Sequence, residues 1–145
     1  MGGSNRRLAR ARLADRRGGY SMLNTAKLVG FVPTTDFKKA KAFYEGVLGL
    51  SVVSQDSFAM VLDSNGTMIR VTKVANLTAF PFTILGWDVP DIEAAVTELT
   101  QKGVKFEQFG MPGQDDRGIW TAPGGAKVAW FKDPGENVLS ITQFA

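Results

Sequence analysis

The chain has 145 residues, of which 44% are hydrophobic and 21% are charged. This length and balance are typical of one soluble globular domain, and they exclude a disordered chain and a membrane-spanning one, because no apolar run approaches about 18 residues. Cysteine and histidine are both absent, which excludes disulfides, thiolate or imidazole catalysis, and zinc sites built from sulfur or imidazole nitrogen.

Residues 1–21 form a compositional unit that contains Gly18-Gly19 near its end. This segment holds six arginines and one acid, Asp15, so it accounts for the basic net charge of +3. Clustered arginines can neutralise phosphates, but we expect a flexible basic extension, with nucleic-acid binding unlikely. An interaction module that uses this arm is one alternative for the function. The segment lacks the apolar core of a secretory signal, so we expect a cytoplasmic protein without membrane contact.

The first half of the remaining chain predicts a strand, a helix and three further strands. Residues 28–35 have strand composition. Asp36 follows as a helix N-cap, and apolar residues at helical spacing continue to Gly49, which is placed to end the helix. Three strand-like runs come next, at residues 50–54, 58–62 and 67–73.

The second half repeats this order. Residues 81–89 predict a strand, and Asp91 caps a predicted helix that ends at Gly103. Asp91 lies 55 residues after Asp36, at the equivalent point. Four strands are predicted after the helix, near residues 104–109, 118–121, 127–132 and 137–142.

These repeats predict an α+β fold of two tandem βαβββ units, at about 26–77 and 81–144, within one domain at 22–145. In such a unit the helix covers one face of the sheet and leaves the other face open. Two open faces curved together would form a half-open sheet around a cavity, and strand alternation predicts which side chains line it.

Two segments resemble a known family. The segment TTDFKKAKAFYEGVLGLSVV (34–53) is similar to the first strand–helix–strand of the vicinal oxygen chelate superfamily, which includes glyoxalases, bleomycin-resistance proteins and extradiol dioxygenases, and VAWFKDPGENVLSITQ (128–143) is similar to its closing hairpin. The resemblance covers about residues 26–144. It implies this fold but does not choose among activities, because the superfamily contains both metal-dependent enzymes and metal-free binding proteins.

The resemblance also locates the metal ligands of the family. Metal-using members place His or Gln early in the first strand of each unit and Glu in the last strand. The positions equivalent to these ligands hold Val29, Arg70, Ile84 and Ser140. Hydrocarbon side chains cannot ligate a metal, and a guanidinium repels a cation. We therefore expect a member that lacks the metal site and has no cofactor.

Strand alternation predicts a set of side chains that line the cavity. The predicted ligand-binding residues are Phe31, Met68, Arg70, Ile84, Asp88, Ser140 and Trp130. A buried lone guanidinium is costly, so Arg70 binds an anionic ligand, pairs with Asp88 or lies at an exposed rim position. Asp88 is also the candidate for a catalytic base in an apolar pocket.

Alternation does not settle which face Trp130 occupies. The same holds for three further candidates on neighbouring strands, Phe58, Met60 and Trp120. Residues 110–117 predict a loop between strands. This loop is either a lid over the site or a polar connection.

The sequence therefore predicts a metal-independent small-molecule binding protein, with a role such as ligand sequestration or antibiotic resistance. The expected ligand is aromatic or partly anionic. The resemblance implies a homodimer, because family members commonly complete their cavities by pairing units between chains. The first alternative, ahead of the interaction module, is a metal-independent lyase or isomerase of the same superfamily that uses Asp88, Arg70 or a tyrosine such as Tyr44.

Overall fold

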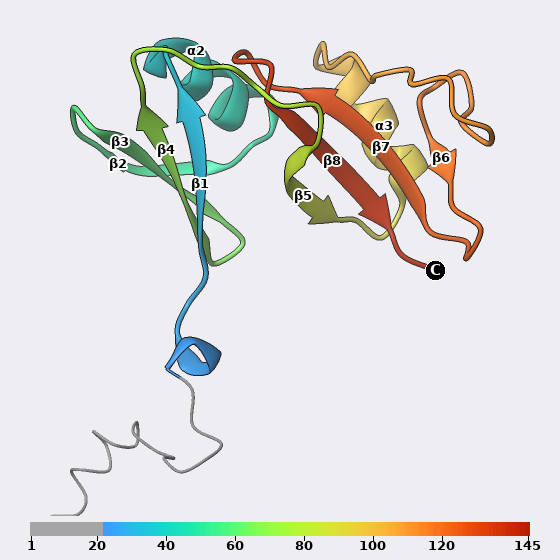
Figure 1. The fold of residues 1–145 in the computed structure, drawn as a ribbon, viewed down its shortest axis with the longest axis horizontal. Coiled ribbons are helices and arrows are strands. Elements are labelled where there is room, and N and C mark those ends of the chain that lie inside the picture. The colour runs from blue at the N-terminus through green and yellow to red at the C-terminus, as the bar shows by residue number, and fades with distance from the viewer. Residues whose placement is uncertain (1–21) are drawn as a thin grey trace, which may run out of the picture.

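The computed structural model describes residues 22–145 and contains two four-stranded sheets (Figure 1). The predicted basic extension lies outside the described residues. The first sheet has the order β1-β4-β3-β2 and the second β5-β8-β7-β6. In each unit, the strands that come first and last along the chain are parallel neighbours, β1 with β4 and β5 with β8. The strands are β1 (Val29–Thr34), β2 (Ser51–Gln55), β3 (Ala59–Ser64), β4 (Thr67–Lys73), β5 (Thr83–Asp88), β6 (Trp120–Thr121), β7 (Lys127–Lys132) and β8 (Val138–Gln143).

The arrangement confirms the predicted fold of two βαβββ units. A short 3₁₀ turn, η1 (Leu23–Thr25), precedes β1. Within residues 22–145, no helix is long and apolar enough to cross a membrane.

Each unit has one helix, and both helices begin at the predicted cap. The first is α2 (Phe37–Lys41), which continues as the π-helical segment η2 (Ala42–Val47), and the second is α3 (Ile92–Gln101). The Asp36 and Asp91 carboxylates accept backbone hydrogen bonds three residues ahead, each at 3.1 Å. These caps satisfy amide groups that the first helical turn leaves without partners. Gly49 adopts a φ of 80°, as expected for a residue that ends a helix.

The predicted strand at residues 104–109 does not form, and the predicted strand at 118–121 is reduced to β6. Glu107 donates its backbone N–H to the Trp130 carbonyl of β7 at 2.8 Å. The carbonyl of Glu107 and the N–H of Phe109 instead bind the side chain of Gln114. Because a side chain takes these backbone groups, they cannot continue a β-ladder.

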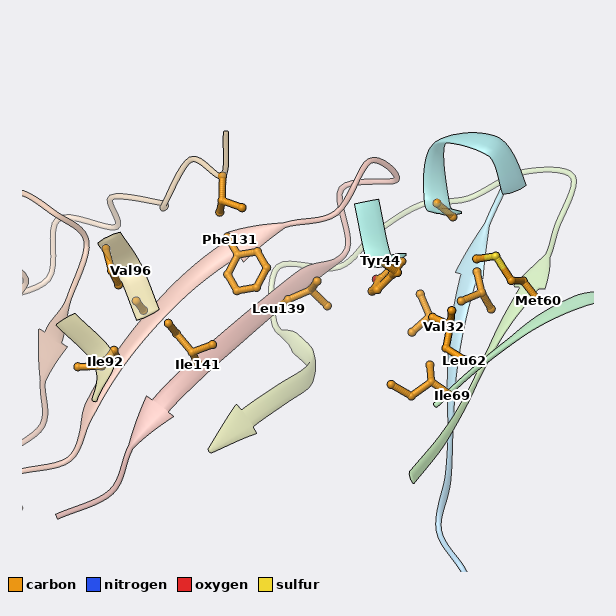
Figure 2. Packing of buried hydrophobic residues seen from close by; sticks show 14 of the residues in the cluster. Val32, Tyr44, Met60, Leu62, Ile69, Ile92, Val96, Phe131, Leu139 and Ile141 are labelled. Atoms are coloured by element: carbon orange, nitrogen blue, oxygen red, sulfur yellow. The ribbon is translucent and has the colours of Figure 1, made fainter. Parts of the chain in front are cut away.

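One hydrophobic core joins the helix-side faces of both sheets. Figure 2 shows its two parts, with Val32, Leu62 and Ile69 in the first unit and Ile92 and Ile141 in the second. All five side chains are at most 3% exposed. The core therefore holds the two units together.

The way the units pack determines where the open faces point. The δ-methyl group of Leu85, on β5, lies 3.7 Å from the position that a Cβ on Gly30 would occupy. Gly30 shares a strand face with the buried Val32, so Leu85 packs on the helix side of the first sheet. The open face of the first sheet is thus left uncovered by the second unit.

Candidate ligand-binding faces

The open face of the first sheet carries Phe31, Met68 and Arg70. Phe31 and Arg70 are cross-strand partners on β1 and β4, and Met68 lies two residues earlier on the same face. Phe31 is 61% exposed and Met68 is 43% exposed, whereas the alternate residues Ile69 and Val71 are buried. A shallow pocket of about 200 Å³ lies beside Met68 on this face. Three of the predicted site residues are therefore neighbours on one exposed surface.

Arg70 is half-buried on this face. Within residues 22–145, no carboxylate lies within 4.0 Å of its guanidinium, so the alternative pair with Asp88 does not form. The backbone N–H groups of Ala59 and Phe58, and then the positive charge of Arg70, hold the pKa of the Asp56 carboxyl below its ordinary value. The positive charge of Arg70 thus favours the ionised form of the nearby Asp56 carboxyl.

The open face of the second sheet carries an aromatic cluster. The ring centroid of Trp130 lies 5.3 Å from that of Phe109 in an edge-to-face arrangement, and 6.2 Å from that of Trp120. Ser140 is the cross-strand partner of Trp130 and also pairs with Gly86. Because the neighbouring Ala129 and Phe131 are buried in the core, alternation places the Trp130 side chain on the other, open face.

The sequence did not identify Phe109, which is 50% exposed, as part of this cluster. The direction of the Phe109 side chain could not be predicted, because residues 104–109 do not form a strand and so do not alternate between two faces. The sequence singled out Trp120 and Trp130 but left their facing open, and the structure places the two rings beside each other. Of the other two undecided residues, Met60 is fully buried in the core and Phe58 is 76% exposed.

Ile84 and Asp88 both lie on β5, but only Ile84 leaves these faces. Ile84 sits at a β-bulge between Thr83 and Leu85, and it is half-buried against the core. Asp88 is exposed at the end of β5, and it pairs with Thr142 two residues after the Gly86–Ser140 pair, so alternation keeps it on the open face of the second sheet. It also lines a groove of about 390 Å³ between the units. The seven predicted residues therefore fall into a first-sheet group, a second-sheet group that extends to Asp88, and Ile84 outside both.

Tyr44, the alternative catalytic group, is not available for chemistry. Its side chain is 1% exposed, and its hydroxyl donates a hydrogen bond to Asp133 at 2.7 Å. Burial, and secondly the charge of Asp133, raise the pKa of the Tyr44 phenol far above its ordinary value. The phenol therefore stays protonated at neutral pH.

The residues at the four metal-ligand positions do not fit a divalent cation. Val29 and Ile84 offer only hydrocarbon, and Arg70 carries a positive charge. Ser140 offers one neutral hydroxyl, which alone is a weak ligand. Its side chain is 6% exposed and packs closely against Gly86 of the neighbouring strand. Within the described part of the chain, no group of three or more acidic residues is arranged to hold a metal ion.

Comparison with solved structures supports the same fold. A bleomycin resistance determinant encoded on transposon Tn5 matches with a TM-score of 0.65 and 21% identity, over 83% of this chain and 98% of that one. TnmS3, an antibiotic-binding protein from Streptomyces sp. CB03234, matches with a TM-score of 0.64 and 21% identity, over 86% and 100%. A lactoylglutathione lyase from Agrobacterium tumefaciens matches with a TM-score of 0.63 and 14% identity, over 82% and 93%.

No curated protein is a significant match to the sequence. The family model for the Glyoxalase/Bleomycin resistance protein/Dioxygenase superfamily matches residues 25–141. This match extends over both units and includes both segments that carried the resemblance. The chain therefore belongs to the glyoxalase/bleomycin resistance protein/dioxygenase superfamily.

Proposed function

We propose that this protein binds a small aromatic or partly anionic molecule without a metal ion. The observation that supports this function is the pair of open sheet faces, one with Phe31, Met68 and Arg70 and the other with an aromatic cluster around Trp130. Exposed aromatic rings can stack on a planar ligand, and a guanidinium can bind its anionic group. Two structures of the same fold are those of a bleomycin resistance determinant and an antibiotic-binding protein.

The proposed function includes a homodimer. Phe31 and Met68 leave apolar surface exposed on the first sheet, and the second unit of the same chain does not cover it. Contiguous exposed apolar surface is typical of an interface. A second copy would bring its aromatic cluster opposite Phe31 and Arg70, and a two-fold arrangement would form two such sites. Ligand sequestration would then require both chains.

A thermal-shift screen tests this function. The panel contains bleomycin, 2-naphthoate, its neutral analogue 2-naphthamide and the non-aromatic cyclohexanecarboxylate. A ligand that binds only the folded state raises stability, by about 2.7 kcal/mol at a hundred times its dissociation constant. We expect an aromatic compound to raise the melting temperature both with and without EDTA. The proposal fails if no aromatic compound does so, or if binding disappears with EDTA and returns with one metal ion per chain.

A further inference from the structure

The loop after Phe109 is organised by one side chain. The Oε1 atom of Gln114 accepts a hydrogen bond from the Phe109 N–H at 2.8 Å. Its Nε2 group donates to the Glu107 carbonyl at 2.9 Å and to the Gly118 carbonyl at 3.0 Å. One carboxamide thus uses its acceptor and both of its donors on backbone groups. These three bonds join the start of the loop to its end.

The same bonds hold the aromatic cluster. The backbone of Phe109 is bound directly by Gln114, and Glu107 is tied to β7 at the Trp130 carbonyl. The indole N–H of Trp120 donates to the Pro112 carbonyl, inside the loop, at 3.0 Å. The rings of Phe109 and Trp120 therefore keep their places beside Trp130 only if the loop keeps its shape.

The far end of the loop is anchored to α3 and to the core. Arg117 donates from Nη2 to the Thr97 hydroxyl at 2.6 Å and to the Glu93 carbonyl at 3.1 Å. Gly118 has a φ of 92°, and a Cβ there would lie 3.0 Å from the Cβ of Phe106. Only glycine accepts both this backbone conformation and this close approach. These contacts tie the end of the loop to α3 beside the second sheet.

We propose that Gln114 is a positioning residue for ligand binding, which holds Phe109 edge-on to Trp130 and so keeps the aromatic cluster ready for a planar ligand. This inference rests on the proposed function, because it assigns a role within that site. A preformed surface binds more tightly than a mobile one, since the entropy of ordering the loop is lost on folding and not on binding. Gln114 would act through these rings and not through contact with the ligand.

Three variants test the role of Gln114. Gln114→Ala removes all three hydrogen bonds, and Gln114→Glu keeps an acceptor for Phe109 but loses both donors at neutral pH. Gln108→Ala is the matched control, because the Gln108 side chain also binds the loop, through the Asp116 carbonyl at 3.1 Å, without touching the backbone of Phe109. The probe is 2-naphthoate, with its dissociation constant measured by calorimetry. The near-ultraviolet circular dichroism of the ligand-free protein reports the Trp120–Trp130 geometry.

We expect Gln114→Ala to weaken 2-naphthoate binding by about tenfold and to reduce the tryptophan signal, while the far-ultraviolet spectrum stays that of a folded chain. Gln108→Ala should change neither quantity by more than about twofold. Gln114→Glu should behave like the alanine variant at pH 7. It should recover part of the tryptophan signal as the pH falls toward about 4, because a protonated carboxyl can donate to one of the two carbonyls.

The possible results separate the two proposals. If wild-type protein binds neither 2-naphthoate nor any other aromatic compound, the proposed function fails and the role of Gln114 in binding fails with it. If wild-type protein binds the probe and Gln114→Ala binds it equally well, only the positioning role is overturned. A changed tryptophan signal with unchanged affinity also overturns it, because Gln114 would then be purely structural. If the alanine variant does not fold, the pH series of Gln114→Glu decides the question.

Discussion

The Tyr44 hydroxyl donates a 2.7 Å hydrogen bond to Asp133, although 89 residues separate them in the chain. Asp133 also accepts hydrogen bonds from the backbone of Gly135 and Asn137, both at 2.9 Å. The Asn137 side chain donates to Asp133 at 2.8 Å and to the Pro33 carbonyl of β1 at 3.1 Å. The turn between β7 and β8 is thereby bound to the helix and to the first strand of the other unit. This network specifies how the units pack.

The Tyr44–Asp133 contact predicts a loss of stability at alkaline pH. Burial, and then Asp133, raise the pKa of Tyr44 above its ordinary value. Near pH 10 the unfolded phenol ionises and the folded one does not, so the unfolded state binds fewer protons. The free energy of unfolding should therefore be fully present below about pH 10 and fall above it, by up to about 1.4 kcal/mol per pH unit from this residue. Urea unfolding of wild type and Tyr44→Phe between pH 8 and pH 11 measures the difference.

Tyr44→Phe should also lower stability at pH 7, by about 1–3 kcal/mol, because the buried Asp133 loses a donor. The control is Tyr20→Phe, which removes the other tyrosine of the sequence and should keep the alkaline slope of the wild type. An identical slope in wild type and Tyr44→Phe would contradict the assignment.

The parts of the fold that the sequence predicted are those governed by local rules. Asp36 and Asp91 begin their helices as expected, because an N-cap depends only on the next few residues. Alternation fails at Ile84, because the bulge beside it breaks the two-residue period. The position of Phe109 depends on a side chain five residues later, Gln114, which no periodic pattern reveals.

The relation between the two open faces could not be predicted for a similar reason. Alternation predicts that Phe31 and Arg70 share a face, and the structure shows them as cross-strand partners. It does not say whether that face meets the second unit. That depends on the contact of Leu85 with the Gly30 side of the first sheet, which involves two segments far apart in the chain. The role of these residues in binding stays a prediction.

The residues at the four metal-ligand positions of the family predict that the functional protein contains no divalent metal ion; they are Val29, Arg70, Ile84 and Ser140. Purified protein should contain far less than one equivalent of Zn, Ni, Fe or Mn by elemental analysis, because the side chains at those positions cannot coordinate one. EDTA should leave the melting temperature within the error of the measurement. A stoichiometric metal ion that is lost in the double variant Arg70→Ala, Ser140→Ala would show that this reasoning is wrong.

The exposed face of the first sheet predicts a dimer that a charge would disrupt. Phe31→Glu places a carboxylate in the middle of the proposed interface, where desolvating it is costly. The dimer dissociation constant measured by sedimentation velocity should rise at least tenfold, or roughly 1.4 kcal/mol. Ala42→Glu is the control, since Ala42 is exposed on the helix side of the sheet. A wild-type protein that is monomeric at micromolar concentration would contradict the prediction.

Arg70 predicts that the site distinguishes ligands by charge. Its guanidinium is half-buried and has no carboxylate within 4.0 Å among residues 22–145, so a bound anion would become its partner. Arg70→Ala should weaken binding of 2-naphthoate by about tenfold and binding of 2-naphthamide by much less, since a hydrogen bond to a charged group contributes roughly 1.5–3 kcal/mol. Arg117→Ala is the matched control, because that guanidinium already binds Thr97 and Glu93. It should affect both probes alike.

Arg70→Ala also tests whether the guanidinium of Arg70 lies near Asp56, as in the structure. The charge of Arg70 is one of the causes that hold the pKa of Asp56 low, after the backbone hydrogen bonds from Ala59 and Phe58. Arg70→Ala should therefore raise the Asp56 pKa slightly, as measured by carboxyl NMR, while the backbone bonds keep it below its ordinary value. If the Asp56 pKa rises and both probes lose affinity equally, Arg70 is where the structure places it, and the ligand is not anchored by its charge.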